Sequence, residues 1–242
     1  IASLQRFVER NPGATEVELH LARALIADKR YAEARQHFDH LLQRYPDKAE
    51  VVYPVAILAL QQQEFAFAEK QLRHLLTLDF ADKSVPSYYL GQIAEEARRH
   101  DEALEWYRKV GPGDNYLPAR MRSAHLLSTL GRLDDARREL REARSATPQE
   151  RAQLSVAEAQ MLRDAKRPQE AFDLLEGELA RQPAQPEMLY ESALLAEKLG
   201  KTELMETRLR KLIEVQPGSA QAYNALGYSL AERNVRLAEA QA

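Results

Sequence analysis

Apolar side chains between residues 15 and 46 recur at the spacing of an amphipathic helix, first over one segment and then over a second. The first segment places Leu21 and Leu25 on one face, and the second places Phe38 and Leu41 on one face. Residues three or four apart lie on the same side of an α-helix, so each segment has one apolar stripe. The pattern predicts two helices that are joined by a short turn.

The same pair of segments returns about every 34 residues along the whole chain. A helix pair of this kind cannot bury its apolar face alone, but stacked neighbours bury it between them. We therefore predict an array of stacked pairs instead of two globular domains. The array has half a unit at 1–12, complete units at 15–48, 49–83, 84–116, 117–151, 152–185 and 186–219, and a further half unit at 220–242.

Each of several second segments has a small residue, alanine, at the position where its apolar stripe begins. A small side chain there lets two helix backbones approach closely, while larger neighbours fill the space beside them. We expect a larger side chain at these positions to overpack the interface at a cost of about 1–3 kcal/mol. The set includes Ala34, Ala68, Ala103 and Ala136.

The turn inside each pair has a position that suits glycine. Gly131 and Gly200 occupy it in two units, where a positive φ is needed. The other units carry longer residues there, and we expect their turns either to stay nearer the helical region or to be mildly strained. These residues are Lys29, Gln63, Arg98 and Lys166.

Composition narrows the function classes. The 242 residues are 45% hydrophobic and 29% charged, with a net charge of −3 and both signs interspersed. A nucleic-acid surface would need a basic stripe, and the most basic stretch, 132–151, is explained by charge pairs on a solvated helix. The absence of cysteine excludes disulfides and thiol chemistry. The longest apolar run, 51–60, is too short to span a membrane and contains Pro54.

The period and the small and apolar positions resemble the tetratricopeptide repeat (TPR) family across the whole chain. The resemblance implies an all-α fold, a right-handed superhelix of antiparallel helix pairs. First helices would line a concave groove, and second helices would form the convex face. The register then places these side chains in the groove: Leu19, Arg23 and Ile26; Tyr53, Ile57 and Leu60; Tyr88, Gln92 and Glu95; Met121, His125 and Ser128; Val156, Gln160 and Arg163; Tyr190, Leu194 and Glu197; Asn224 and Tyr228.

These groove positions are richer in tyrosine and aliphatic residues than a solvated face should be. Tyrosine and methionine are enriched at interaction surfaces, so we predict a groove that binds a peptide or a helix. The alternative is that several of these side chains pack on neighbouring helices. The Lys, Asn and Arg pattern of TPR domains that grip chaperone C-termini is missing, so we do not expect binding of chaperone tails.

A narrower resemblance covers Tyr223 to Leu237, YNALGYSLAERNVRL, which is similar to a string in TPR lipoproteins of Gram-negative bacteria. Some members of that group are outer-membrane adaptors that hold a periplasmic carboxyl-terminal processing protease and bring it cell-wall hydrolases, and the string also occurs in other bacterial TPR proteins. The resemblance implies a protein-binding adaptor in the periplasm, anchored by a lipid outside this segment. The alternatives are a TPR arm of a larger enzyme or of a secretion or polysaccharide-export machine, and a cytoplasmic location.

Candidate chemistry is sparse. His37 and His40 are three residues apart with Asp39 between them, but a zinc site needs further ligands, so a surface pair is the favoured interpretation. The adjacent acids Glu95 and Glu96 point about 100° apart on a helix and cannot form an acid–base pair. No phosphate loop or hydrolase motif is present in the sequence. We therefore predict a protein that is not an enzyme and that needs no metal or cofactor.

Three irregular features complete the predictions. The segment 111–115, GPGDN, predicts a longer loop, and Glu158 stands where a large apolar residue is usual. The chain begins and ends inside a unit, so we interpret it as a piece of a longer protein. Leu4, Phe7 and Val8 lack a preceding helix, so we predict self-association, fraying or capture of another chain at an open end.

Overall fold

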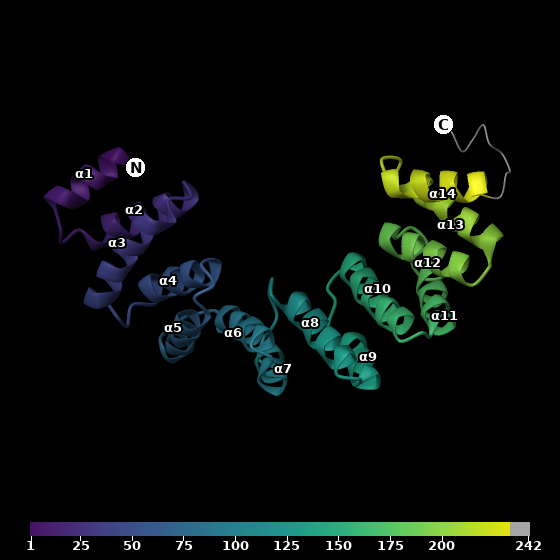
Figure 1. Cartoon of the computed structure of the whole chain (residues 1–242), viewed down its shortest axis with the longest axis horizontal. Helices are drawn as coiled ribbons and strands as arrows, with labels where there is room; N and C mark the ends of the chain where they lie inside the picture. Colours follow the sequence, from purple (N-terminus) through teal and green to yellow (C-terminus); the bar gives the residue numbers. More distant parts are fainter. Residues whose placement is uncertain (233–242) are drawn as a thin grey trace. The chain divides into compact units, whose positions relative to one another are not determined.

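The computed structural model describes residues 1–232, which form fourteen α-helices and no strand (Figure 1). The chain divides into two compact units, residues 1–119 and residues 120 onward. The predicted all-α class is confirmed. Residues 233–242, where we expected a second helix of the last half unit, lie outside the described residues. No described helix is both long enough and apolar enough to cross a membrane.

The first unit holds seven complete helices, and α8 begins just before the division. The bounds are α1 Ala2–Arg10, α2 Thr15–Ala27, α3 Tyr31–Arg44, α4 Ala49–Gln61, α5 Phe65–Thr77, α6 Ser84–Glu96, α7 His100–Arg108 and α8 Tyr116–Thr129. The second unit continues with α9 Leu133–Glu142, α10 Pro148–Asp164, α11 Pro168–Leu179, α12 Pro186–Lys198, α13 Thr202–Val215 and α14 Ala220–Glu232.

The turn between the two helices of a pair has the same hydrogen bonds in all six pairs within residues 1–232. In the first pair, the backbone N–H of Arg30 donates to the carbonyl oxygen of Leu25, and that of Lys29 donates to Ile26, both at 2.9 Å. This is the Schellman pattern, in which the residue after the helix has a positive φ. The same two bonds recur at Gln63, Arg98, Gly131, Lys166 and Gly200.

All six turn residues have a positive φ. The values are 60° for Lys29, 60° for Gln63, 57° for Arg98, 60° for Lys166, 76° for Gly131 and 71° for Gly200. Of the two alternatives for the four non-glycine turns, the strained one is therefore correct and the helical one is wrong. The Schellman bonds impose the conformation, whichever residue is present.

The core of the first unit lies between successive helices. Ala34, Phe38 and Leu41 of α3 are fully buried against α2 and α4, and Ala68 and Leu72 of α5 continue the core. Gly91 of α6 shows how closely the helices approach, because a Cβ built there would lie 2.5 Å from the ring of Tyr107 in α7. The Tyr107 hydroxyl donates to Glu95 at 2.5 Å, which fixes the ring against the glycine.

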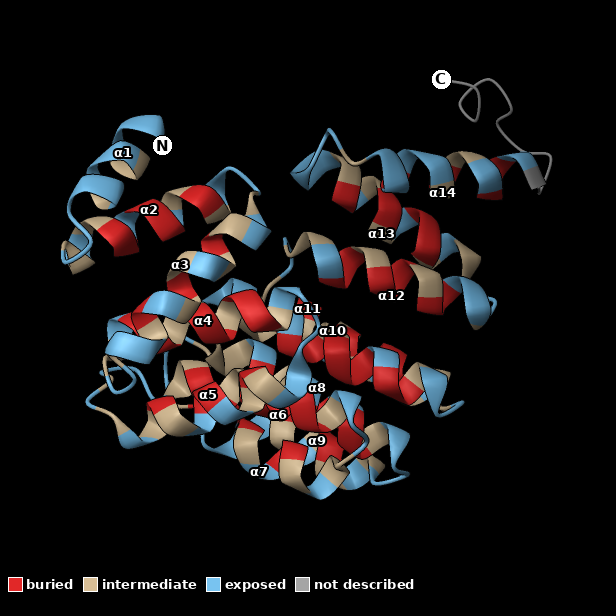
Figure 2. Cartoon of the chain, turned by 60° about the vertical axis from the view of Figure 1, so that its left-hand side comes forward, coloured by how far each residue is buried: buried red, intermediate tan, exposed pale blue. Residues whose placement is uncertain are grey.

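The second unit has a larger continuous core that joins α10, α11, α12, α13 and α14. Leu162, Leu175, Leu195 and Leu212 belong to it. Figure 2 shows the buried positions alternating with exposed ones along α12 and α13, as expected of amphipathic helices. Helices α10 and α12, the first helices of successive pairs, pack on each other as well as on their partners.

Glu158 of α10 is buried in the second unit, with 2% of its surface exposed. Its carboxylate accepts from Arg137 Nε at 2.9 Å and lies 2.6 Å from an Nη of Arg141, both on α9. Two guanidinium groups therefore take the place of the apolar contacts that this position would otherwise make. The ion pairs explain how a carboxylate occupies a site where an apolar residue is usual.

Helix α10 begins at Pro148, earlier than the start of the predicted unit at 152. Thr147 caps it, because the N–H of Glu150 donates to the Thr147 hydroxyl at 3.1 Å and the Glu150 carboxylate accepts from the N–H of Thr147 at 3.2 Å. Proline suits the first turn of a helix, where its missing N–H is not needed. Residues 109–115 connect α7 to α8 and include Gly113 at φ 141°.

The terminal helix of the first unit is covered on one side only. Helix α1 packs on α2 through Leu4 and Val8, but none of its residues is fully buried, and Phe7 is 47% exposed. The open apolar edge that the sequence predicts at this end is therefore present. Whether it drives self-association stays a prediction.

Candidate functional site

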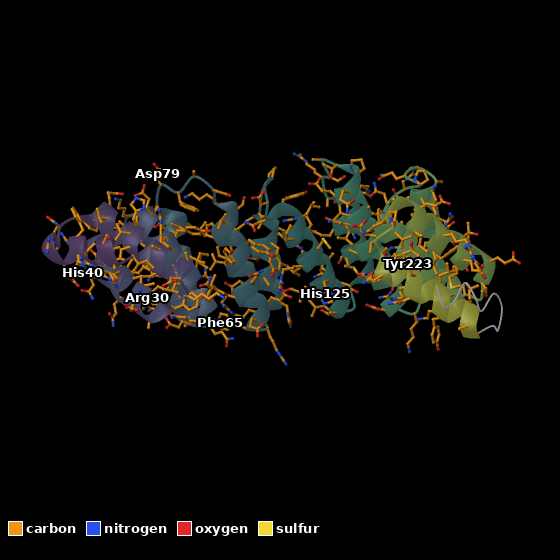
Figure 3. The ribbon with its side chains drawn as sticks, turned by 90° about the horizontal axis from the view of Figure 1, so that it is seen from above. Arg30, His40, Phe65, Asp79, His125 and Tyr223 are labelled. Carbon is orange, nitrogen blue, oxygen red and sulfur yellow. The ribbon has the colours of Figure 1, made fainter. Side chains whose placement is uncertain are left out.

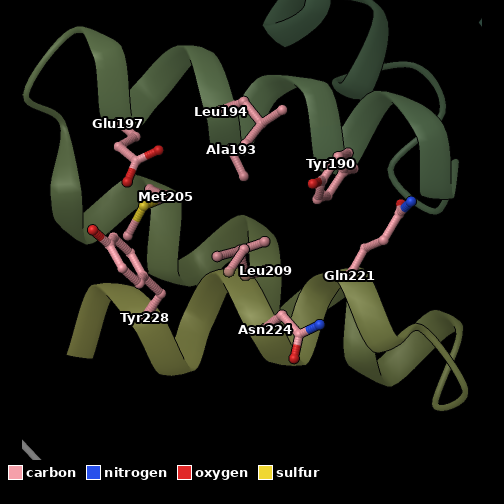
Figure 4. A pocket seen from close by; sticks show the side chains of 10 residues that line it. Tyr190, Ala193, Leu194, Glu197, Met205, Leu209, Gln221, Asn224 and Tyr228 are labelled. Carbon is pink, nitrogen blue, oxygen red and sulfur yellow. The ribbon is translucent and has the colours of Figure 1, made fainter. Parts of the chain in front are cut away.

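A pocket of about 400 Å³ lies between α12, α13 and α14 of the second unit (Figure 4). We call it the α12–α14 pocket. Its floor is apolar, because Ala193, Met205 and Leu209 are buried core residues and Leu194 is half-buried beside them. The full lining is Tyr190, Ala193, Leu194, Glu197, Met205, Leu209, Gln221, Asn224, Ala225 and Tyr228.

Helix periodicity explains how these residues meet. Tyr190, Leu194 and Glu197 follow one another at spacings of four and three, so they lie on one side of α12. Gln221, Asn224 and Tyr228 have spacings of three and four on α14. Helices α12 and α14 thus form the two walls of the pocket. Met205 and Leu209 of α13 complete the lining next to Ala193.

Polar side chains lie at both ends of this pocket, and Asn224 lies between them on α14. Figure 4 shows Glu197 and Tyr228 together at one end, and Tyr190 and Gln221 at the other. Tyr228 is 67% exposed, which is the largest exposure among the exposed large hydrophobic and aromatic side chains of residues 1–232. An aromatic ring that stays in water beside an apolar floor is available for contact with another molecule.

A second pocket of about 310 Å³ adjoins the first and shares Tyr190 and Gln221 with it. We call it the α10–α12 pocket, since much of its lining comes from two helices: Val156 and Gln160 of α10, and Pro186, Glu187, Tyr190 and Glu191 of α12. Its buried Glu191 is ion-paired with Arg163. Glu187, at its rim, accepts a hydrogen bond from the side-chain amide of Gln149 at 2.7 Å. The two pockets form one lined surface across four helices.

Glu197 differs from these acids. Within residues 1–232, its side chain makes no ion pair and no hydrogen bond, while its backbone carbonyl oxygen accepts from the N–H of Gly200 at 2.9 Å in the Schellman turn. It stands in the last turn of α12, where the helix dipole disfavours a negative charge. The contacts of the Glu197 carboxylate within residues 1–232 therefore do not stabilise the fold.

The structure thus gathers part of the predicted groove. Tyr190, Leu194, Glu197, Asn224 and Tyr228 line the first pocket, and Val156 and Gln160 line the second. Arg163 does not line either pocket but holds Glu191. Met121 is half-buried and His125 is exposed on α8 (Figure 3), and neither lines these two pockets, nor does Ser128.

In the first unit the predicted groove residues are partly used for packing. Leu19 is 3% exposed and belongs to the core, so it is not available to a partner. The ring of Tyr53 packs on Phe80 with centroids 5.4 Å apart, and Tyr88 packs on Tyr89 at 5.6 Å. Burial raises the pKa of Tyr89, with a further contribution from Tyr53 and Tyr88. The half-buried positions are Ile26, Ile57, Leu60, Gln92 and Glu95, and Arg23 is exposed.

Several lining residues were missed by the sequence analysis. Gln221 and Ala225 lie on the same side of α14 as Asn224, so the helical period itself could have found them. Met205 and Leu209 are buried residues of α13, a second helix, so a register of first-helix positions does not include them. Their place in the lining depends on how α12, α13 and α14 pack together, which is a property of the folded structure.

The two histidines of α3 have a partner that the sequence did not suggest. His37 Nδ1 and His40 Nδ1 lie 3.3 and 2.8 Å from one carboxylate oxygen of Glu18, a buried residue of α2, and His40 is labelled in Figure 3. Asp39 pairs instead with Arg35 at 2.8 Å. Among the described residues, no group of three or more His, Asp or Glu side chains could hold a metal ion.

The sequence of this chain is similar to those of known repeat proteins. Two family models described as tetratricopeptide repeat match the chain, one over residues 1–51 and 25–85 and the other over 121–186. The chain is 38% identical over 154 residues to the TPR repeat-containing protein PA4667 of Pseudomonas aeruginosa. That match covers 64% of this chain but only 26% of the relative, so the chain spans about a quarter of the relative's length.

Solved structures share the fold. The C-terminal part of a TPR repeat-containing protein from Cytophaga hutchinsonii superposes with a TM-score of 0.63 at 19% identity, covering 92% of this chain and 91% of that one. A tetratricopeptide repeat protein from Parabacteroides merdae gives 0.57 at 14% identity, covering 95% and 90%. The family models together match more than half of the residues, and the helix pairs have the expected arrangement. The chain therefore belongs to the tetratricopeptide repeat family.

Proposed function

We propose that this chain is a non-catalytic scaffold that binds partner proteins through the α12–α14 pocket and the α10–α12 pocket beside it. The observation that carries the proposal is an apolar floor of Ala193, Met205 and Leu209 that opens beside the exposed ring of Tyr228. Apolar pockets with a few polar groups at the rim are the usual form of a binding site. Tyrosine is enriched among residues that contribute most to protein binding.

The extent of the lined surface favours a polypeptide over a compact small molecule. The two pockets share Tyr190 and Gln221, and residues from α10, α12, α13 and α14 line them. An extended segment or one face of a helix can place side chains in both pockets at once. Recognition of this kind uses a few anchoring side chains at regular spacing.

A matched pair of tyrosines on α14 tests the proposal. Tyr228 lines the pocket, whereas Tyr223 does not, and both are exposed, so neither Tyr228→Ala nor Tyr223→Ala should unfold the chain. Bound proteins are captured from cell-envelope extracts on each variant, identified by mass spectrometry and titrated against the purified chain. We expect Tyr228→Ala, alone or with Asn224→Ala, to weaken binding about tenfold, as removal of an anchoring aromatic does. Equal binding by both tyrosine variants refutes the proposal.

The narrower form of the proposal is an adaptor for a periplasmic carboxyl-terminal processing protease, presenting cell-wall hydrolases to it from an outer-membrane lipid anchor outside this segment. Two observations support it: the similarity of Tyr223 to Leu237 to TPR lipoproteins, and a relative from the Gram-negative bacterium Pseudomonas aeruginosa. The full-length protein is captured from cell envelopes to test this. Recovery of a periplasmic protease supports the adaptor role, and recovery of cytosolic proteins alone excludes it.

The competing proposal is a TPR arm of a larger enzyme or export machine. The observation that favours it is that most of the relative's length lies outside the match. A catalytic or barrel domain elsewhere in the full-length protein would favour the arm. A lipid-modified cysteine upstream of this segment would favour the adaptor.

A further inference from the structure

The two pockets of the second unit have acidic side chains in their linings but no Lys, Arg or His. Glu197 lines the α12–α14 pocket, and Glu187 and Glu191 line the α10–α12 pocket. Glu191 is neutralised by Arg163, and Glu187 is held by a neutral amide. Glu197 has no partner among residues 1–232, so the negative charge at the first pocket is the least compensated of the three.

The surroundings of Glu197 suit a cation. Figure 4 shows its carboxylate at the same end of the pocket as the ring of Tyr228, which belongs to the opposite wall. Figure 4 draws Met205 between the two, so a lysine or arginine side chain at this end of the pocket would meet the carboxylate and the aromatic ring beside the thioether of Met205. Both contacts attract a positive charge, and the aromatic one favours arginine in particular.

Folding gives no reason for a carboxylate at this position. Glu197 lies in the last turn of α12, where a negative charge faces the negative end of the helix dipole. The first pocket's other end, with Tyr190 and Gln221, carries no charge. The electrostatic asymmetry of the pocket therefore comes from Glu197 alone.

We propose that the α12–α14 pocket takes a polypeptide segment that lays an apolar side chain on the floor of Ala193, Met205 and Leu209 and places a lysine or arginine at the end of the pocket where Glu197 and Tyr228 lie. This rests on the proposed function and specifies the chemistry of its partner. An acidic segment would meet the like charge of the exposed Glu197, and a purely apolar one would cover that carboxylate without giving it a partner, which is costly. Charge complementarity thus selects a basic and apolar segment.

The test uses labelled peptides of one length that differ at a single residue. Each has a central leucine flanked by arginine, glutamine or glutamate, and fluorescence anisotropy gives its affinity for the 242-residue chain. We expect the arginine peptide to bind about fivefold more tightly than the glutamine peptide, the upper range of one solvent-accessible ion pair. The glutamate peptide should bind most weakly, and the differences should shrink as salt is raised.

Two variants assign the preference to its residue. Glu197→Gln keeps the shape of the side chain and should bind the arginine and glutamine peptides equally. Glu203→Gln is the matched control, since Glu203 is an exposed acid of α13 outside both pocket linings, and it should keep the full preference. Glu197→Lys should invert the order and favour the glutamate peptide. Circular dichroism confirms that each variant is folded.

The outcomes separate this inference from the proposed function. If all peptides bind the wild type equally and Tyr228→Ala abolishes binding, the basic preference is refuted while the pocket remains a binding site. If peptides bind but Tyr228→Ala changes nothing, or if none binds, both proposals fail. Competition by unlabelled chain at the concentration where it self-associates would identify a second copy as the occupant and would also overturn the inference.

Discussion

The six Schellman turns allow a test in which almost nothing changes except how readily one residue adopts a positive φ. Lys166 closes the α10–α11 turn at φ 60°, and Gly200 closes the α12–α13 turn at 71°. We consider Lys166→Gly and Gly200→Ala. The Lys166 side chain is exposed and makes no ion pair within residues 1–232, and a Cβ built on Gly200 meets no atom within 4 Å. Neither substitution therefore removes or creates a side-chain contact that the structure describes.

The expected size follows from two opposing terms. A residue with a side chain pays about 1–2 kcal/mol to hold the left-handed conformation, and glycine does not. Glycine instead loses about 0.5–1 kcal/mol through the greater freedom of the unfolded chain. The difference makes Lys166→Gly more stable by about 0.5–1 kcal/mol. Gly200→Ala should be less stable by a similar amount, because the same two terms change sign.

Urea unfolding followed by circular dichroism measures both variants, with the midpoint compared at constant slope. Stacked repeats can open one at a time, so hydrogen exchange of the amides around each turn provides a local reading. Protection should rise near Lys166 in Lys166→Gly and fall near Gly200 in Gly200→Ala. A loss of stability in Lys166→Gly, or none in Gly200→Ala, would refute the conclusion that the Schellman bonds impose strain on the non-glycine turns.

Three further predictions concern the core and its ion pairs. Gly91→Ala should destabilise the first unit by about 1–3 kcal/mol despite alanine's better helix propensity, because its Cβ would meet the fixed ring of Tyr107; a midpoint at or above that of the wild type would contradict this. Glu158→Ala should cost about 2 kcal/mol by leaving two guanidinium groups without their buried partner, whereas Glu158→Leu should cost less; thermal unfolding that ranks the two variants the other way would count against the account. The pKa of Glu69 is held below its ordinary value by the hydrogen bond from Arg99, partly offset by burial, so the wild type should exceed Glu69→Gln by up to about 1 kcal/mol at pH 7. A lowered folded pKa means that this stability is complete above the unfolded pKa and is lost as the pH falls through the folded one. Urea midpoints of the two proteins should therefore converge once the pH is below the folded pKa of Glu69, and a gap that is independent of pH would argue against the ion pair.

The sequence was sufficient to predict the helices because their apolar stripes are local. Leu21, Leu25, Phe38 and Leu41 were assigned to the core from spacing alone, and all four are fully buried. Burial of one stripe against the next pair needs no long-range information beyond the repeat itself. The period also placed the turn residues, since each follows the last apolar position of a first helix.

Long-range pairing was beyond the sequence. Nothing in the local pattern indicates that Glu158 meets Arg137 and Arg141, or that Glu18 is the carboxylate between His37 and His40. Each of these contacts joins residues from different helices, and its formation depends on how far the helices are rotated and inserted. The φ of each turn residue is beyond the sequence for the same reason, because several hydrogen bonds of the turn decide it together.

The candidate site was only partly predictable. The register identified which side of each first helix could face a partner, and in the second unit this included Tyr190, Leu194, Asn224 and Tyr228. It did not distinguish a free side chain from one that packs on its neighbours, as Tyr53 and Tyr88 do. The packing of neighbouring helices decides this, and it also brings second-helix side chains such as Met205 and Leu209 into the lining.

Site-specific photo-crosslinking in intact cells tests the central claim most directly. A photoreactive amino acid replaces Tyr228 in one version of the full-length protein and Tyr223 in another, so the two probes share a helix and differ in whether they line the pocket. The account predicts a crosslinked partner band from position 228 that Leu194→Glu abolishes, and little or none from position 223. Equal crosslinking from both positions, or a band from position 228 that survives Leu194→Glu, would contradict it.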